Sequence, residues 1–170
     1  MSTRINTLLL LRHAKSDYPD GVADHERPLA ARGIREAAMA GDWIRANVPP
    51  IDAVLCSTAT RTRQTLARTG IDAPVRYVDR IYDATPGTVI DVINGVESEF
   101  GADVSTVLLI GHEPAMSATA LALSDGRNTA VAQEISLKFP TSAIAVLQTG
   151  SPWHELSVGG AELVTFHVPR

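Results

Sequence analysis

The chain has 170 residues, 45% of them apolar and 20% charged, which is typical of a globular protein with its own buried core. A formal net charge of −4, with no basic cluster, argues against nucleic-acid binding. The single cysteine, Cys56, excludes an internal disulfide and favours a reducing compartment. We therefore expect one domain, spanning residues 1–170.

The apolar run at residues 5–11 is too short to span a membrane. It leads directly into Arg12-His13-Ala14-Lys15, and no convincing cleavage site follows it, so a buried strand explains it better than a signal peptide. The sequence predicts a cytoplasmic protein that does not associate with membranes.

Strand-like and helix-like segments alternate along the chain. Residues 30–48 have apolar side chains at helical spacing and stop at Pro49-Pro50, and residues 60–69 stop at Gly70. We expect strands at residues 5–11, 52–56, 75–78, 106–110, 143–147 and 163–168, helices at residues 30–48, 60–69, 85–100 and 114–123, and a loop at residues 17–27.

This alternation predicts an α/β fold: a three-layer sandwich with a mostly parallel central sheet and helices on both faces. The last two strands are joined by a short connection around Ser151-Pro152, which predicts an antiparallel pair at one edge of the sheet.

Three expected strands end in polar residues. Arg12-His13 follows the first strand, Cys56-Ser57 ends the second, with Arg61 just beyond it, and Gly111-His112 follows the fourth. Ligands of open parallel sheets bind outside the carboxyl ends of the strands. These segments should therefore converge on one site.

Two arginines and two histidines at one point suit phosphoryl transfer. The arginine guanidinium matches phosphate oxygens in a bidentate way, and clustered arginines need an anion between them. A neutral histidine is a good nucleophile, and a nearby arginine keeps it neutral by disfavouring imidazolium.

At these residues the sequence resembles a known family. Leu11-Arg12-His13-Ala14 is similar to the Arg-His-Gly signature of the histidine phosphatase superfamily, also called phosphoglycerate-mutase-like. Further segments resemble that family in the same order, the last of them its small SixA-type phosphohistidine phosphatases: residues 27–33, 57–65, 111–114 and 139–143.

The resemblance implies a metal-independent phosphatase that needs no cofactor. His13 would be the nucleophile and would become phosphorylated, and Arg12, Arg61 and His112 would bind the phosphoryl oxygens. Ser57, Glu113 and Asp17 are expected to line the substrate-binding site, although Glu113 could instead balance the start of the following helix.

The sequence departs from the family at Ala14, where glycine is usual, and at Thr58, where proline is usual. The proton donor is less well defined, because larger relatives carry a glutamate between the second arginine and the second histidine. Asp83 is the candidate at that place, and Asp17 and Asp24 are rivals because their loop should border the site.

The expected substrate is a phosphorylated protein, namely protein phosphohistidine. The chain has few insertions that could enclose a small ligand, and a phosphohistidine leaving group tolerates a weak acid. A small phosphate ester, handled by a phosphatase or mutase, remains an alternative, as does a non-catalytic phospho-binding module. A cysteine phosphatase is disfavoured because Thr62 stands where Arg would follow Cys56, and no metal-ligand cluster is visible.

Overall fold

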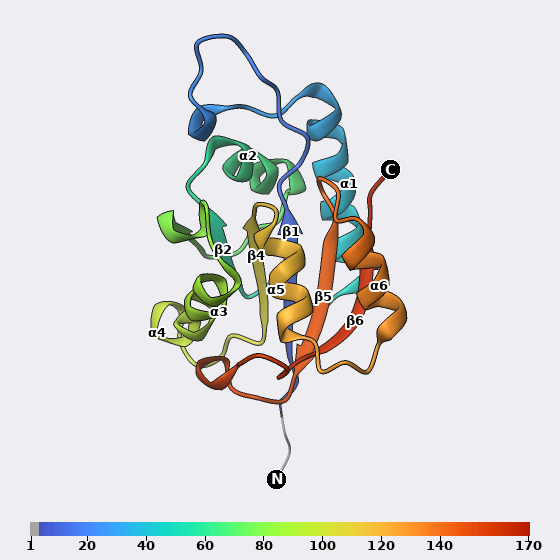
Figure 1. Ribbon diagram of the computed structural model, residues 1–170. Helices are drawn as coiled ribbons and strands as arrows, with labels where there is room; N and C mark the ends of the chain where they lie inside the picture. Colours follow the sequence, from blue (N-terminus) through green and yellow to red (C-terminus); the bar gives the residue numbers. More distant parts are fainter. Residues whose placement is uncertain (1–3) are drawn as a thin grey trace.

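The structure, a computed structural model, describes residues 4–170 and contains a six-stranded mixed sheet with helices on both faces (Figure 1). The strand order is β3-β2-β4-β1-β5-β6. The strands are β1 (Asn6–Arg12), β2 (Ala53–Ser57), β3 (Val75–Val78), β4 (Thr106–Gly111), β5 (Ile144–Thr149) and β6 (Glu162–His167).

The first four strands run parallel, whereas β5 is antiparallel to both β1 and β6. The predicted α/β class and the antiparallel pair at one edge are therefore confirmed. The helices are α1 (Ala31–Asn47), α2 (Thr60–Thr69), α3 (Pro86–Asn94), α4 (Val96–Phe100), α5 (Ala115–Leu123) and α6 (Thr129–Leu137).

Alternate side chains of the central strands supply the two halves of the core, because successive residues of a strand point to opposite faces. Leu9 and Leu11 of β1 pack with Ala40 and Ile44 of α1 and with α2. Leu8 and Leu10 pack on the other face, together with residues from α3, α5 and α6. Burial on both faces explains why β1 is a continuous apolar run.

Two glycines allow close approaches around α1. A Cβ atom on Gly41 would lie 2.0 Å from the carbonyl oxygen of Thr69, so α1 and α2 can pack this closely only with glycine at that position. A Cβ atom on Gly33 would lie 2.1 Å from the carbonyl oxygen of Lys15, so the segment after β1 rests directly on the first turn of α1.

Three expectations need correction. The helix expected at residues 85–100 is two helices, because the chain turns at Gly95, whose N–H bonds to the oxygen of Val92. Helix α6 was not expected, because among its residues only Ile135 is buried and the apolar period is weak; the Asn128 side chain caps it. The β5–β6 connection is not short: it covers residues 150–161 and includes a turn that buries Trp153.

Within residues 4–170, no helix combines the length and the apolar character needed to cross a lipid bilayer.

Candidate active site

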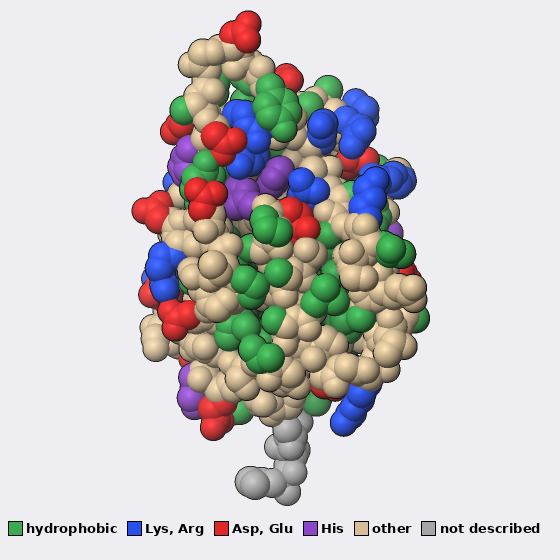
Figure 2. All heavy atoms as spheres, in the orientation of Figure 1, with side chains coloured by type: hydrophobic (Ala, Val, Ile, Leu, Met, Phe, Trp, Pro, Cys, Tyr) green, Lys and Arg blue, Asp and Glu red, His purple; other side chains and the backbone are tan. Residues whose placement is uncertain are grey.

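The three polar strand ends meet at one edge of the sheet because β2, β4 and β1 are neighbours in it. Arg12 is paired with Gly111 in the β1–β4 register, and the N–H of His13 donates to the oxygen of Gly111 at 3.0 Å. The rings of His13 and His112 consequently lie 5.3 Å apart, centroid to centroid. Figure 2 shows histidine side chains gathered near this end of the molecule, with Lys and Arg side chains around them.

His13 is held as a neutral ring with one nitrogen available. Its Nδ1 lies 2.7 Å from the carbonyl oxygen of Ala14, and since a carbonyl only accepts, Nδ1 carries the proton and Nε2 keeps its lone pair. Burial, with further contributions from the neighbouring cationic groups, lowers the pKa of His13 to about 3. A neutral imidazole with an unprotonated Nε2 is the form that a nucleophile requires.

His112 is oriented by Ser57, which is completely buried. Nε2 of His112 lies 2.8 Å from Oγ of Ser57, and this oxygen accepts a hydrogen bond from the N–H of Ala59 at 3.3 Å. The serine proton is then available to Nε2, and a serine that donates it there leaves the ring proton of neutral His112 on Nδ1. Burial, followed by the charge of Arg61, lowers the pKa of His112 to about 4.

Both arginines are fixed through their terminal nitrogens. Arg12 donates from Nη1 to the oxygen of Phe139 at 3.0 Å. Arg61 donates from Nη1 to the backbone oxygen of Asp24 at 2.7 Å and from Nη2 to Oδ2 of Asp24 at 3.1 Å. Among the described residues, Nε of each arginine and Nδ1 of His112 are buried without a hydrogen-bond partner.

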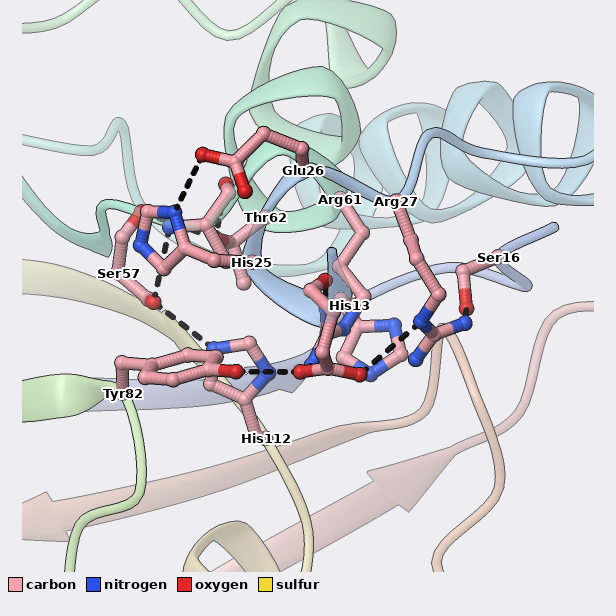
Figure 3. Close-up of polar contacts among 12 residues, drawn as sticks. His13, Ser16, His25, Glu26, Arg27, Ser57, Arg61, Thr62, Tyr82 and His112 are labelled. Carbon is pink, nitrogen blue, oxygen red and sulfur yellow. Dashed lines mark hydrogen bonds and ion pairs between the residues drawn. The ribbon is translucent and has the colours of Figure 1, made fainter. Parts of the chain in front are cut away.

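Buried donors without partners are rare in proteins and each requires an explanation. Three unpaired N–H groups, two of them on cations, form a set that can bind the oxygens of a tetrahedral anion. Figure 3 shows the side chains of His13, Arg61 and His112 gathered in one place, with Tyr82 beside His112.

Arg12, His13, Arg61 and His112 form the cluster of the candidate site, and hydrogen bonds also fix the backbone around it. Ser142, with φ +66°, donates its N–H to the oxygens of both Arg12 and His13, at 3.1 Å each. Oγ1 of Thr65 accepts from the N–H of Ala14 at 2.9 Å and donates to the oxygen of Arg61 at 2.7 Å. Across residues 4–170, positive φ at a non-glycine residue is confined to Asp83 and Ser142, so Ala14 in place of the usual glycine needs no strained backbone.

The loop at residues 17–27 borders the cluster, as expected, and contributes Asp24. The Asp24 carboxylate accepts hydrogen bonds from Nε of Arg27 at 3.0 Å, from Nη2 of Arg61 at 3.1 Å, and from the hydroxyl of Tyr82. The hydroxyl of Tyr82, followed by the two guanidinium groups, holds the pKa of Asp24 well below its usual range.

The acid candidates occupy different positions. Asp83 is exposed, has φ +58°, and makes no hydrogen bond to the cluster in the described part of the chain. Asp17 is also exposed, and its Oδ1 accepts from the N–H of Tyr18 at 3.0 Å, within its own loop. The structure therefore joins Asp24 to the cluster, and does not join Asp83 or Asp17 to it by a side-chain hydrogen bond.

Glu113 is placed both to stabilise the start of α5 and to lie beside the site. Its carboxylate accepts from the N–H of Ser117 at 2.6 Å and from Oγ of the same residue at 2.7 Å, in the first turn of α5. Its charge also counteracts the fall that burial causes in the pKa of Arg12. Both the helix-start alternative and a place beside the site thus have structural support.

Sequence reasoning missed three residues near the cluster. Tyr82 lies edge-on to His112 at 5.4 Å, and Arg27 binds Asp24 and Oγ of Ser16, the latter at 2.7 Å. His25, which had no supporting sequence context, lies edge-on to Tyr82 and within 3.0 Å of Oγ1 of Thr58. Two signals in the sequence could have pointed to these residues. Tyr82 directly precedes the candidate Asp83, and Arg27 begins the 27–33 segment.

A mostly parallel α/β sheet with arginine and neutral histidine side chains at three adjacent strand ends defines an α/β phosphatase of the histidine type. The comparison with known families agrees: the model of the histidine phosphatase superfamily (branch 1) matches residues 8–100. The chain belongs to the histidine phosphatase superfamily, and the membership predicted from the sequence is thereby confirmed.

Three similar proteins illustrate the relationship. The uncharacterised Mycobacterium tuberculosis protein Rv1276c is 62% identical over 162 residues, covering 94% of this chain and 100% of the relative. A structure of a candidate phosphohistidine phosphatase SixA from Nakamurella multipartitia has a TM-score of 0.88 at 39% identity, covering 97% of this chain and 96% of the other. The phosphohistidine phosphatase SixA of Escherichia coli is 26% identical over 141 residues, covering 81% of this chain and 82% of that protein.

Proposed function

We propose that this phosphatase hydrolyses protein phosphohistidine through a phosphohistidine intermediate on His13, within a single cytoplasmic domain. The observation that carries the proposal is the set of unpaired buried donors on Arg12, Arg61 and His112 beside a neutral His13 whose Nδ1 is already bonded. A site that only bound phosphate would need the donors but not an oriented nucleophile.

The reaction proceeds in two displacements. Nε2 of His13 attacks phosphorus in line with the leaving group, and Arg12, Arg61 and His112 hold the three other oxygens. Water then attacks the phosphorylated His13 and releases inorganic phosphate. The donors act most strongly as negative charge develops, because His13 and Arg61 are only 7% and 6% exposed and water screens them little. The positive charge comes from the two arginines, so the steps use no metal or other cofactor.

The substrate class is inferred from the surroundings of the site. Residues 17–24, which border the cluster, form an exposed loop whose Tyr18 is 70% exposed, so another protein has a surface to contact beside the site. The relatives described as SixA are named as phosphohistidine phosphatases, which supports the same class for this chain. A small phosphate ester is the competing substrate.

The test is phosphate release, with EDTA present, from a phosphohistidine protein and from a panel of phosphate monoesters. We expect turnover that favours the phosphohistidine protein and is lost in His13→Ala but kept in His154→Ala. His154 is exposed and pairs with Glu97, which is not part of the cluster. Preference for a monoester would mean that the protein is a small-molecule phosphatase instead. Activity that survives in His13→Ala would contradict the nucleophile.

A further inference from the structure

Asp24 is the one acidic side chain among the described residues that hydrogen-bonds directly to a site arginine of the cluster, and it is held as an anion. Oδ1 accepts from Arg27, while Oδ2 accepts from Arg61 and from the hydroxyl of Tyr82. All three partners are donors, and two of them are permanently charged. A general acid must stay protonated until the transition state, and surroundings made of donors and positive charges favour the anion instead.

The position of Asp24 places this charge on the leaving-group side. His13 is buried at the end of β1, so attack in line with the leaving group drives that group outward, toward solvent. Asp24 reaches toward solvent from Arg61, since its side chain is 56% exposed and that of Arg61 only 7%. An ionised carboxylate there repels an alkoxide or phenolate as it forms and attracts a leaving group that carries an N–H or a positive charge.

The carboxylate also has room for one more donor. Two carboxylate oxygens offer about four acceptor positions, and Arg27, Arg61 and Tyr82 use three of them. The remaining position is on Oδ1, the oxygen that accepts from Arg27 alone. Around this network also lie His25, which packs against Tyr82, and His112. The acidic groups nearby are Glu26, which contacts His25, and Asp83, whose charge acts on Tyr82.

We propose that Asp24 accepts a hydrogen bond from the protonated distal ring nitrogen of a phosphoimidazole, and that this contact selects phosphoramidates over phosphate esters. The inference rests on the proposed function and deepens it, because it assigns the substrate preference to a particular residue. It also explains why the site needs no general acid at the place where larger relatives carry one.

The bonds and protons balance without an acid. The lone pair of His13 Nε2 forms the new N–P bond, and the P–N bond of the substrate breaks with its electron pair moving to the substrate nitrogen. The distal ring nitrogen keeps its proton throughout, so the substrate departs as neutral imidazole hydrogen-bonded to Asp24. An alkyl ester has no such proton and must leave as an alkoxide.

The experiment compares Asp24→Asn with wild type on N-phosphoimidazole, 4-nitrophenyl phosphate and an O-phosphoserine peptide. Asp20→Asn is the matched control, since Asp20 is an exposed carboxylate of the same loop without a hydrogen bond to the cluster in the described structure. We expect kcat/KM for N-phosphoimidazole to fall about 10- to 100-fold in Asp24→Asn, as for loss of a charged hydrogen bond, and the two esters to change by less than about threefold. Asp20→Asn should behave as wild type on all three.

The other outcomes overturn the inference in distinguishable ways. An equal fall on all three substrates means that Asp24 only positions Arg61. A larger fall on the phosphoserine peptide than on N-phosphoimidazole means that Asp24 is a general acid. The proposed function itself is contradicted if the wild type does not turn over N-phosphoimidazole, or if His13→Ala still does. Both results are independent of what Asp24→Asn does.

Discussion

Oγ of Ser57 lies 2.8 Å from Nε2 of His112 and thereby joins the end of β2 to the end of β4. The contact orients the ring of His112, and a proton donated by Ser57 to Nε2 leaves the ring proton of neutral His112 on Nδ1. That nitrogen is one of the unpaired donors of the site. The buried hydroxyl therefore favours the tautomer in which His112 can donate to a phosphoryl oxygen.

Replacing this hydroxyl should weaken catalysis without removing the site. In Ser57→Ala the proton of His112 is no longer directed to Nδ1, and we expect kcat/KM to fall by roughly tenfold, the effect of one lost buried hydrogen bond. The measurement is steady-state phosphate release, with Ser136→Ala on the exposed end of α6 as the control. Unchanged kcat/KM in Ser57→Ala would show that the contact does not set the tautomer.

The buried histidines should make stability depend on pH. The pKa values of His13 and His112 in the folded chain are about 3 and about 4, below the unfolded value, so only the unfolded state binds protons as the pH falls below about 6.5. The free energy of unfolding is then highest above that pH and falls toward pH 4 by about 1.4 kcal/mol per pH unit for each histidine. His167, whose pKa burial also lowers, contributes in the same direction.

Urea unfolding at pH 7.5 and pH 5.5 measures this dependence. His13→Asn has no titrating ring at that position and should show a smaller slope than wild type. His154→Asn, at an exposed position, should keep the slope. Stability that stays constant between the two pH values would mean that the site histidines take up protons in the folded protein as readily as in the unfolded chain.

The contact between α1 and α2 should tolerate no side chain at Gly41. The added methyl group of Gly41→Ala would overlap the backbone of Thr69, and we expect a loss of about 1–3 kcal/mol in unfolding free energy from overpacking. Gly87→Ala is the matched control, because the nearest atom to its Cβ would be 3.9 Å away, and alanine is favoured in a helix. Equal unfolding midpoints for the two variants would contradict the close approach.

Arg12 should bind phosphate through its guanidinium geometry as well as its charge. Arg12→Lys keeps the charge but loses the unpaired Nε–H, so we expect the Kd for inorganic phosphate to rise about tenfold, as measured by calorimetry. Arg32→Lys changes an exposed arginine that pairs with the buried Glu36 within α1, and it should leave the Kd unchanged. An unaltered Kd in Arg12→Lys would remove Arg12 from the phosphate-binding set.

Patterns of local origin could be read from the sequence. The apolar run of β1 and the helix stop at Gly70 depend on residues within one element, and the structure has both where they were expected. Helix α6 and the break at Gly95 could not be read in this way. Helix α6 buries little of its own surface, and one glycine within an apolar helical pattern does not by itself say where a helix divides.

The sequence by itself determined the chemistry available at the strand ends, because a parallel sheet brings the residues after β1, β2 and β4 to one edge whatever the loops do. Only the tertiary structure decided which acidic group joins them. Asp24, Arg61 and Tyr82 come from three separate segments, and their contacts depend on how the 17–27 loop folds back over α2. No periodicity encodes such contacts, since they arise from packing between distant parts of the chain.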